Sequence, residues 1–139
     1  MSLTSADRKL LACAIATIER RYRPEWHHVG AALRTRAGRI FTGVHLEAHV
    51  GRAAVCAEAV AIGTAATAEG DFGIETIVAV RHPDPGDPDR TIRVAAPCGI
   101  CRELISDYDG EARVLIPDAG GRPIVRRISE LLPAKFRRT

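Results

Sequence analysis

Apolar residues near the start of the chain recur at the spacing of one helical face. This spacing predicts a core-facing helix over residues 5–21, which Thr4 or Ser5 can cap and which Pro24 ends. The pattern then changes to alternation of apolar and other residues, twice in succession and with a glycine-containing turn between the two runs. We therefore expect a β-hairpin with strands over residues 28–35 and 40–46.

The rest of the chain alternates between helical and extended segments in the same way. An Ala-rich stretch that ends at Gly70 predicts a buried helix, and the nearly continuous apolar run after it predicts a strand. Residues 82–89 contain three prolines and a glycine, so they predict an exposed loop. The remaining expected elements are helices over 55–69, 98–107 and 128–132 and strands over 74–80, 112–116 and 123–125.

This order, α-β-β-α-β-α-β-β-α, predicts an α/β fold in which helices cover both faces of a mixed sheet. The chain has 139 residues and a mass of 15.0 kDa, which fits one domain over residues 1–139. Hydrophobic residues make up 46% of it and charged residues 27%, which excludes a disordered chain and allows a packed core.

Charge and hydropathy argue against two classes of binding partner, nucleic-acid polymers and membranes. The net charge is only +3, and the arginines are scattered along the sequence, so we expect no nucleic-acid polymer as partner. No apolar run approaches the ~20 residues of a membrane span, and the N-terminus lacks the pattern of a signal peptide. We expect no membrane and a cytoplasmic location, where the four cysteines would be reduced thiols or metal ligands.

Cysteine stands at the start of two predicted helices, as Cys56 in one and Cys98 in the other. Unpaired N–H groups and the helix dipole favour thiolates at such positions. Cys98 and Cys101 share one face of a first helical turn, so both sulfurs can reach one ion while Cys56 supplies a third ligand. Zinc with three protein ligands keeps one position open for water, and Glu58 could move protons beside it.

Other interpretations of these residues exist. A lone Cys-x-x-Cys can be a redox pair, and an isolated Glu58 can be a solvated helix residue. The combination is more specific, because Cys-x-Glu followed by Pro-Cys-x-x-Cys is the signature of zinc-dependent base deaminases. The sequence therefore predicts Zn²⁺ held by Cys56, Cys98 and Cys101, with Glu58 as catalytic acid and base. We expect Cys13 to be a small core residue.

Several further segments resemble the small cytidine deaminase family, in order and over almost the whole chain. Within that family, residues 63–66 and 128–133 are most similar to blasticidin S deaminases. The resemblance implies a three-layer α/β/α cytidine deaminase-like fold with a five-stranded mixed sheet, assembled as a homotetramer whose active sites borrow residues from neighbours. The segments are Gly30-Ala31-Ala32-Leu33, Gly38-Arg39-Ile40-Phe41-Thr42-Gly43, Cys56-Ala57-Glu58, Pro97-Cys98-Gly99-Ile100-Cys101-Arg102 and Leu131-Leu132-Pro133-Ala134-Lys135-Phe136.

The resemblance also implies residues that contact a substrate. Backbone groups near Ala57 and Pro97 would bind the Watson–Crick edge of a base, and Glu47 would bind a sugar hydroxyl. Phe136 belongs to the segment with which relatives reach a neighbour's active site, although it could also pack within its own subunit. The family has Asn-Val-Glu-Asn where this chain has His-Leu-Glu-Ala, so His45 replaces an amide.

His45 is then either a replacement hydroxyl partner or a strand-end residue without a role. Near its unperturbed pKa of ~6.5 its ring could be cationic and favour an acidic or acceptor group. The other four histidines are expected at the surface. They are His27, His28, His49 and His82.

The expected reaction is hydrolytic deamination of a free cytosine nucleoside, of the cytidine or deoxycytidine type, to its uracil form and ammonia. The first alternative is an aminoacylnucleoside antibiotic of the blasticidin S type. A nucleic-acid deaminase is disfavoured, because such sites more often use His as first ligand and need a basic strand channel. A non-catalytic module that zinc stabilises as an oligomer is the last alternative, and the presence of Glu58 argues against it.

Overall fold

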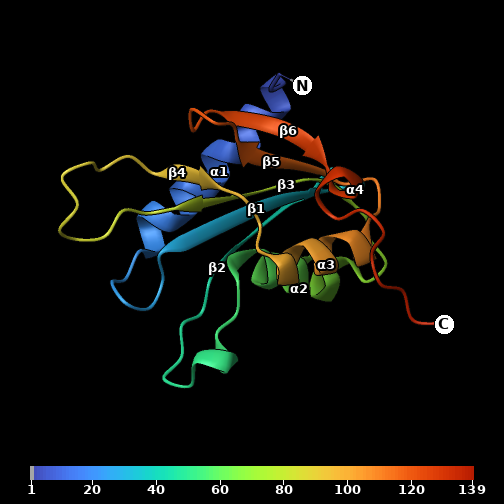
Figure 1. Ribbon diagram of the computed structural model, residues 1–139, viewed down its shortest axis with the longest axis horizontal. Helices are drawn as coiled ribbons and strands as arrows, with labels where there is room; N and C mark the ends of the chain where they lie inside the picture. The colour runs from blue at the N-terminus through green and yellow to red at the C-terminus, as the bar shows by residue number, and fades with distance from the viewer. Residues whose placement is uncertain (1) are drawn as a thin grey trace.

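The computed structural model describes residues 2–139, which form one mixed sheet with helices on both faces (Figure 1). The predicted elements are present, and most of their ends agree to within one or two residues. The helices are α1 (Ser5–Arg21), α2 (Ala57–Glu69), α3 (Gly99–Tyr108), α4 (Ile128–Leu131) and the short 3-10 helix η1 (Gly51–Ala53). The strands are β1 (Val29–Thr35), β2 (Ile40–Val44), β3 (Ile74–Arg81), β4 (Arg93–Ala95), β5 (Arg113–Pro117) and β6 (Pro123–Arg127).

The sheet has the principal order β2-β1-β3-β5-β6. β3 and β5 are parallel, whereas β1 pairs antiparallel with both β2 and β3, and β6 pairs antiparallel with β5. The short strand β4 pairs antiparallel with the last residues of β3. The expected five-stranded mixed sheet is therefore confirmed, and β4 is a sixth strand that the sequence pattern did not indicate.

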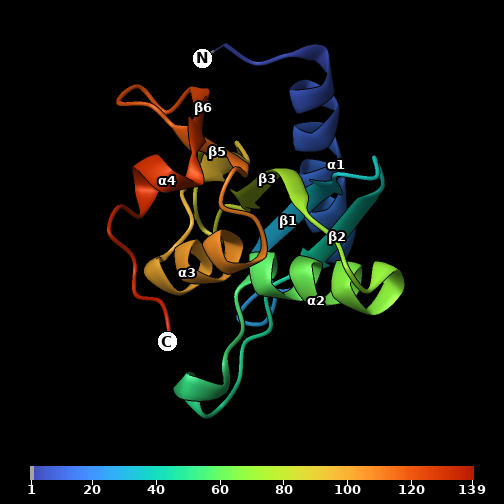
Figure 2. The ribbon, with the colours of Figure 1, turned by 90° about the vertical axis from the view of Figure 1, so that its right-hand side faces the viewer.

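The two faces of the sheet carry separate apolar clusters, because successive side chains of a strand point to opposite faces. Leu33 and Ile77 pack against α2 and α3, while Ala32 and Val78 pack against α1. Figure 2 shows α1 on one side of the strands and α2 and α3 on the other. The result is the three-layer α/β/α arrangement expected from the resemblance.

Two glycines let the helices approach the sheet closely. A Cβ atom at Gly43 in β2 would lie 2.7 Å from the backbone nitrogen of Ala61 in α2. A Cβ atom at Gly30 in β1 would lie 2.9 Å from Cβ of Ile18 in α1. Because real Cβ atoms do not approach other atoms this closely, any larger residue at Gly43 would push α2 away from the sheet.

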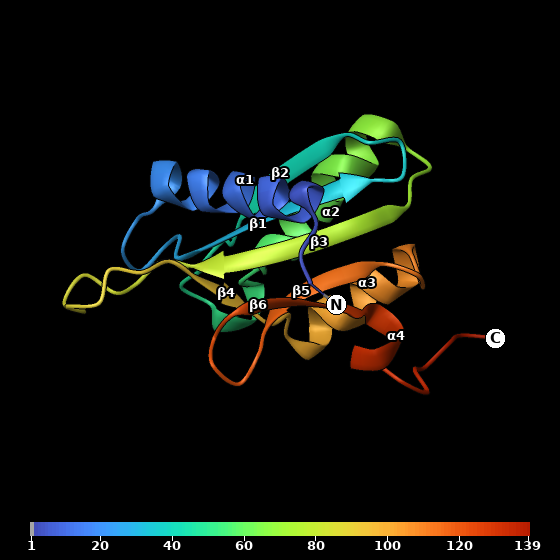
Figure 3. The same ribbon diagram turned by 90° about the horizontal axis from the view of Figure 1, so that it is seen from above.

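Three loops lie at the end of the sheet where β1 begins and β3 ends (Figures 1 and 3). They are the loops between α1 and β1, between β2 and α2, and between β3 and β4. The loop before β1 is tied to the loop after β3, since the backbone N–H of His82 donates to the carbonyl of His28 at 2.7 Å. Residues 82–89 contain no helix or strand, as expected. No helix within residues 2–139 is long and apolar enough to cross a membrane.

Candidate functional site

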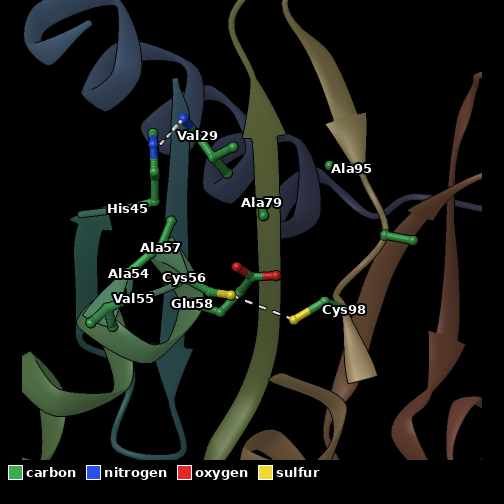
Figure 4. A pocket seen from close by; sticks show the side chains of 11 residues that line it. Val29, His45, Ala54, Val55, Cys56, Ala57, Glu58, Ala79, Ala95 and Cys98 are labelled. Carbon is green, nitrogen blue, oxygen red and sulfur yellow. Dashed lines mark hydrogen bonds between the residues drawn. The ribbon is translucent and has the colours of Figure 1, made fainter. Parts of the chain in front are cut away.

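Three cysteines converge between the starts of α2 and α3. Cys56 is the N-cap residue of α2 and Cys98 that of α3, and Cys101 lies in the first turn of α3. The sulfurs of Cys56 and Cys98 are 3.4 Å apart, and the three sulfurs all lie within 4.8 Å of one another (Figure 4). The structure thus brings together the three ligands that the sequence predicted.

Local contacts set the positions of these helix starts. Val55 and Leu46 exchange two backbone hydrogen bonds of 2.9 Å, which keep the chain extended until Cys56 and start α2 at Ala57 rather than at Val55 as expected. Before α3, the guanidinium of Arg102 donates to the carbonyl of Pro97 at 2.9 Å. Its other branch donates to the carbonyl of Leu131 at 3.1 Å. Arg102 therefore ties the approach to α3 to the C-terminal helix, a positioning role that the sequence did not predict.

The thiols influence one another's ionisation. Burial and the hydrogen bond with Cys98 raise the pKa of the Cys56 thiol. Burial and the nearby charge of Glu58 raise the pKa of Cys101 strongly. Burial also acts on Cys98, but hydrogen bonds from the backbone N–H groups of Cys101 and Ile100 and from the neighbouring thiols outweigh it and leave the pKa of Cys98 lowered.

This donor set fits a zinc ion. Three thiols and one carboxyl group crowd together, and no Lys or Arg lines their pocket within residues 2–139. The thiols can ionise together only next to a cation, and a coordinating thiol is deprotonated outright by the metal. Soft thiolate ligands select zinc over magnesium or calcium. Cys13, the fourth free thiol, is partly buried and packs against the α1 cluster, in keeping with the expected core position.

Glu58 lies in the first turn of α2 and points toward the thiols (Figure 4). Only 6% of this residue is exposed. Burial raises the pKa of its carboxyl group, while its own backbone N–H and the thiol of Cys101 partly oppose the shift. A carboxyl group whose pKa moves upward toward neutrality can both take up and release a proton, which suits general acid–base catalysis.

A cavity of about 260 Å³ opens onto this group of side chains. Its walls are mostly apolar and come from β1, β3, β4 and the segment before α2. The residues around it are Val29, His45, Ala54, Val55, Cys56, Ala57, Glu58, Ala79, Ala95, Ala96 and Cys98. Ala95 and Ala96 were missed by the sequence analysis because β4 was missed, and a three-residue strand is too short for a periodic signal.

His45 and Glu47 follow β2, and His45 lies at the other end of the cavity from the thiols (Figure 4). His45 lines the cavity, and its ring extends toward the backbone of Val29 (Figure 4). Glu47 is exposed and does not line it, and its carboxylate accepts a hydrogen bond of 3.0 Å from the backbone N–H of Ala48. A ring nitrogen of His28, one of His45 and a carboxylate oxygen of Glu47 nevertheless lie within 4.8 Å of one another.

The other residues predicted to contact a substrate lie in different places. Ala57 is buried and lines the cavity. Pro97 is buried next to Cys98, and its carbonyl already accepts the bond from Arg102. Phe136 is 77% exposed and lies in a separate hollow beside α3, so the structure does not bring it to the cavity of its own chain. Its contact with a neighbour's site stays a prediction.

The expectation of surface positions holds for only one of the other four histidines. His49 is exposed, whereas His27, His28 and His82 are half-buried. His82 stacks on Tyr22 with ring centroids 3.6 Å apart, and His28 stacks on His45 at 4.7 Å. The expectation is met only in part, because loops that fold back onto one another at this end of the sheet cover part of these three rings.

Known proteins resemble the chain in both sequence and fold. It is 47% identical over 137 residues to a blasticidin-S deaminase of Bacillus cereus. This match covers 99% of this chain and 96% of that protein. A crystal structure of cytidine deaminase from Mycobacterium leprae matches with a TM-score of 0.72 and 27% identity, covering 94% of this chain and 99% of that one. The cytidine deaminase from Burkholderia pseudomallei matches with a TM-score of 0.73 and 29% identity, covering 96% of this chain and 100% of that one.

A family description agrees with these relatives. The sequence model of the cytidine and deoxycytidylate deaminase zinc-binding region matches residues 4–116, which include all three clustered cysteines and Glu58. A module in which zinc serves stability alone is thereby disfavoured, since the homologues are deaminases. Because the match extends over most of the chain, the protein belongs to the cytidine and deoxycytidylate deaminase family and is a zinc-dependent hydrolase.

Proposed function

We propose that this enzyme removes the 4-amino group of the cytosine base in a free nucleoside, with water as the second reactant and ammonia and the uracil nucleoside as products. The observation that carries the proposal is the buried carboxyl group of Glu58 beside three clustered thiols at one end of an otherwise apolar cavity. Cys56, Cys98 and Cys101 would hold the zinc ion. When bound, zinc supplies the Lewis acidity that brings the pKa of a water molecule close to neutrality.

The proton transfers would then be carried out by Glu58. The carboxylate of Glu58 takes one proton from the attacking water and delivers it to ring nitrogen N3 of the base. The same carboxyl group moves a second proton to the departing amino group, which leaves as ammonia. Burial raises the pKa of Glu58 and so brings its protonated and deprotonated forms closer in energy, as both halves of this cycle require.

Several features support a small nucleoside as substrate rather than a polymer. The cavity is compact, and its walls are apolar enough to receive a neutral base. Within residues 2–139 it is lined by no Lys or Arg that could bind a phosphate backbone. The four free cysteines also support a reducing compartment, so we propose that the enzyme works in the cytoplasm.

A second candidate substrate is an aminoacylated cytosine nucleoside of the blasticidin S type. The 47% identity to a blasticidin-S deaminase over 99% of the chain favours it. By comparison, a probable cytidine deaminase of Dictyostelium discoideum is 36% identical over 78% of the chain. Glu47 favours plain cytidine, because it stands at the position that the resemblance to cytidine deaminases implies would bind a sugar hydroxyl. Deamination of cytidine would serve pyrimidine salvage.

Ammonia release from the purified, zinc-loaded protein tests the proposal. The panel consists of cytidine, deoxycytidine, cytosine, CMP and blasticidin S. We expect the highest kcat/KM for cytidine or deoxycytidine. The Glu58→Gln variant should release no ammonia above background from any of these compounds. A higher kcat/KM for blasticidin S than for cytidine would assign the second candidate, and protection of growing cells against the antibiotic would then be expected. No ammonia from any nucleoside would refute the proposal.

A further inference from the structure

The C-terminal segment of the chain, residues 128–139, runs beside α3 (Figures 1 and 2). Helix α4 at the start of this segment packs against α3, and its buried Ile128 belongs to the same apolar cluster as Ile105 of α3. The beginning of α3 also carries two of the three clustered cysteines, Cys98 as its N-cap residue and Cys101 in its first turn. The zinc ligands of the proposed function and the C-terminal segment therefore meet on one helix.

Arg102 follows Cys101 directly and connects these two parts. Its Nε donates to the carbonyl of Pro97, the residue before Cys98, at 2.9 Å. Its Nη1 donates to the carbonyl of Leu131 in α4 at 3.1 Å. Because the donors of a guanidinium form a rigid, planar fork, the two carbonyl groups cannot move apart without the loss of one bond.

A second contact holds the C-terminal segment against α3. The ammonium group of Lys135 forms ion pairs with Glu103, at 3.7 Å, and with Asp107. Only 5% of the Lys135 side chain is exposed, so its charge depends on these two carboxylates more than on water. Within residues 2–139, none of the three side chains lines the cavity or belongs to the cysteine cluster. A change at Lys135 therefore loosens the segment without touching the ligands.

We infer that Arg102 is a positioning residue that couples zinc binding to the docking of the C-terminal segment. The inference rests on the zinc ligands of the proposed function. With the segment docked, the carbonyl of Leu131 holds the guanidinium, and the guanidinium holds Pro97 and the extended backbone that leads into Cys98. With the segment released, Arg102 is free to turn, and zinc must itself order the approach to Cys98, which weakens its binding. Because such coupling is reciprocal, bound zinc also strengthens the docking of the segment.

This coupling makes the metal site responsive to events on the C-terminal segment. Phe136 follows Lys135 directly and is 77% exposed, so a neighbouring chain that contacted Phe136 would act on the same segment. A contact that kept the segment docked would raise the zinc affinity of its own subunit.

Zinc affinity, measured by competition with chelators of graded strength, tests the inference without any substrate. Arg102→Gln cannot reach both carbonyl groups, so we expect about 10-fold weaker zinc binding. Arg102→Lys keeps the positive charge but replaces the fork by a single ammonium group, and should weaken binding to a similar extent. Arg138→Gln, at an exposed position of the same segment, is the matched control and should stay within about 2-fold. Wild-type affinity in Arg102→Lys would show that charge matters rather than the bridge, and would overturn the inference.

A double-mutant cycle with Lys135→Gln separates the coupling from a general loss of stability. Alone, Lys135→Gln should lower the zinc affinity about 3-fold, because a loosened segment holds Arg102 less firmly. In combination with Arg102→Gln it should have no further effect, since the bridge that transmits the loosening is already absent. Losses that multiply, or an unchanged affinity in Lys135→Gln alone, would refute the coupling. The Lys135→Gln arm decides the question even where Arg102→Gln folds poorly.

Hydrogen exchange tests the reciprocal effect. The backbone N–H of Leu132 donates to the carbonyl of Ile128 at 3.0 Å, so its exchange rate reports whether α4 is in place. We expect zinc to slow this exchange about 10-fold in the wild type and to leave it unchanged in Arg102→Gln. An equal effect of zinc on both proteins would contradict the inference. A wild type without zinc affinity would contradict the ligand set and the inference together, whereas failure of the whole nucleoside panel would contradict only the proposed function.

Discussion

The sulfur atoms of Cys56 and Cys98 lie 3.4 Å apart, although 42 positions separate the two residues in the sequence. Because each residue is the N-cap of a different helix, a metal bound between them would join the starts of α2 and α3. The free energy of zinc binding would thereby contribute to the stability of the folded chain.

The first prediction concerns the metal content. We expect about one zinc per wild-type chain by atomic emission spectroscopy, and loss of both the metal and much of the folded protein in Cys98→Ala. Cys13→Ala is the control, because Cys13 packs on the other face of the sheet and should leave the zinc content unchanged. Full zinc occupancy in Cys98→Ala would show that the ligand assignment is wrong.

The second prediction concerns proton transfer by Glu58. Glu58→Gln keeps the shape of the side chain but cannot take up a proton, so kcat should fall by roughly 10²–10⁴ or more, since the residue acts at more than one step. Zinc content and the midpoint of thermal unfolding should match those of the wild type. If Glu58→Gln were as active as the wild type, another group would have to move the protons.

The third prediction concerns the buried ion pair of Asp7 and Arg113. Asp7 is fully buried and accepts two hydrogen bonds from the Arg113 guanidinium, at 2.6 and 2.8 Å. Asp7→Asn leaves this guanidinium without its partner, so we expect the free energy of unfolding at pH 7 to fall by about 3 kcal/mol. Urea unfolding followed by circular dichroism measures the change. Asp71→Asn, at an exposed position, should change it by less than about 0.5 kcal/mol.

The same pair predicts a pH dependence. Burial raises the pKa of Asp7, but hydrogen bonds from Arg113 and Thr4 outweigh burial and leave the folded-state pKa below its usual value. A carboxylate with a lowered pKa stabilises the folded state fully above its unfolded pKa of ~3.9, and this stabilisation disappears as the pH falls through the folded pKa. The difference in free energy of unfolding between wild type and Asp7→Asn should stay constant from pH 7 to about 5. It should become smaller only below pH ~3.9. A difference that narrowed between pH 7 and 5 would contradict this assignment.

The fourth prediction concerns assembly. Phe136 and Ile100 are 77% and 74% exposed in a single chain, so both side chains are open to contact with a neighbouring chain. We expect a homotetramer in which Phe136 contacts a neighbour's site, so multi-angle light scattering should give four times the chain mass of 15.0 kDa. Phe136→Ala should lower kcat/KM, whereas Arg138→Ala on the same tail should not. A fully active monomer at micromolar concentration would disprove both points.

Some of the site follows from local sequence alone. Cys98 and Cys101 lie on one face of a helical turn because three residues make nearly one turn, and this holds wherever the helix packs. The bounds of α1, from Ser5 to Arg21, follow from its apolar spacing and from Thr4, which caps the helix with Asp7. Helical periodicity and capping act between neighbours in the chain, so the sequence displays them directly.

Only the tertiary structure decided the remaining features. Three-residue β4 forms because the end of β3 offers free backbone groups, not because its own residues alternate. The hydrogen bonds that hold the His45 ring come from backbone N–H groups of residues 16 and 17 positions away, and the raised pKa of Glu58 depends on the elements that bury it. The sequence by itself determined which chemical groups this protein carries and where a self-capped helix such as α1 begins. Hydrogen-bond partners and burial arise only when distant segments pack together, and they decided how the His45 ring is held and in which direction the pKa of Glu58 is shifted.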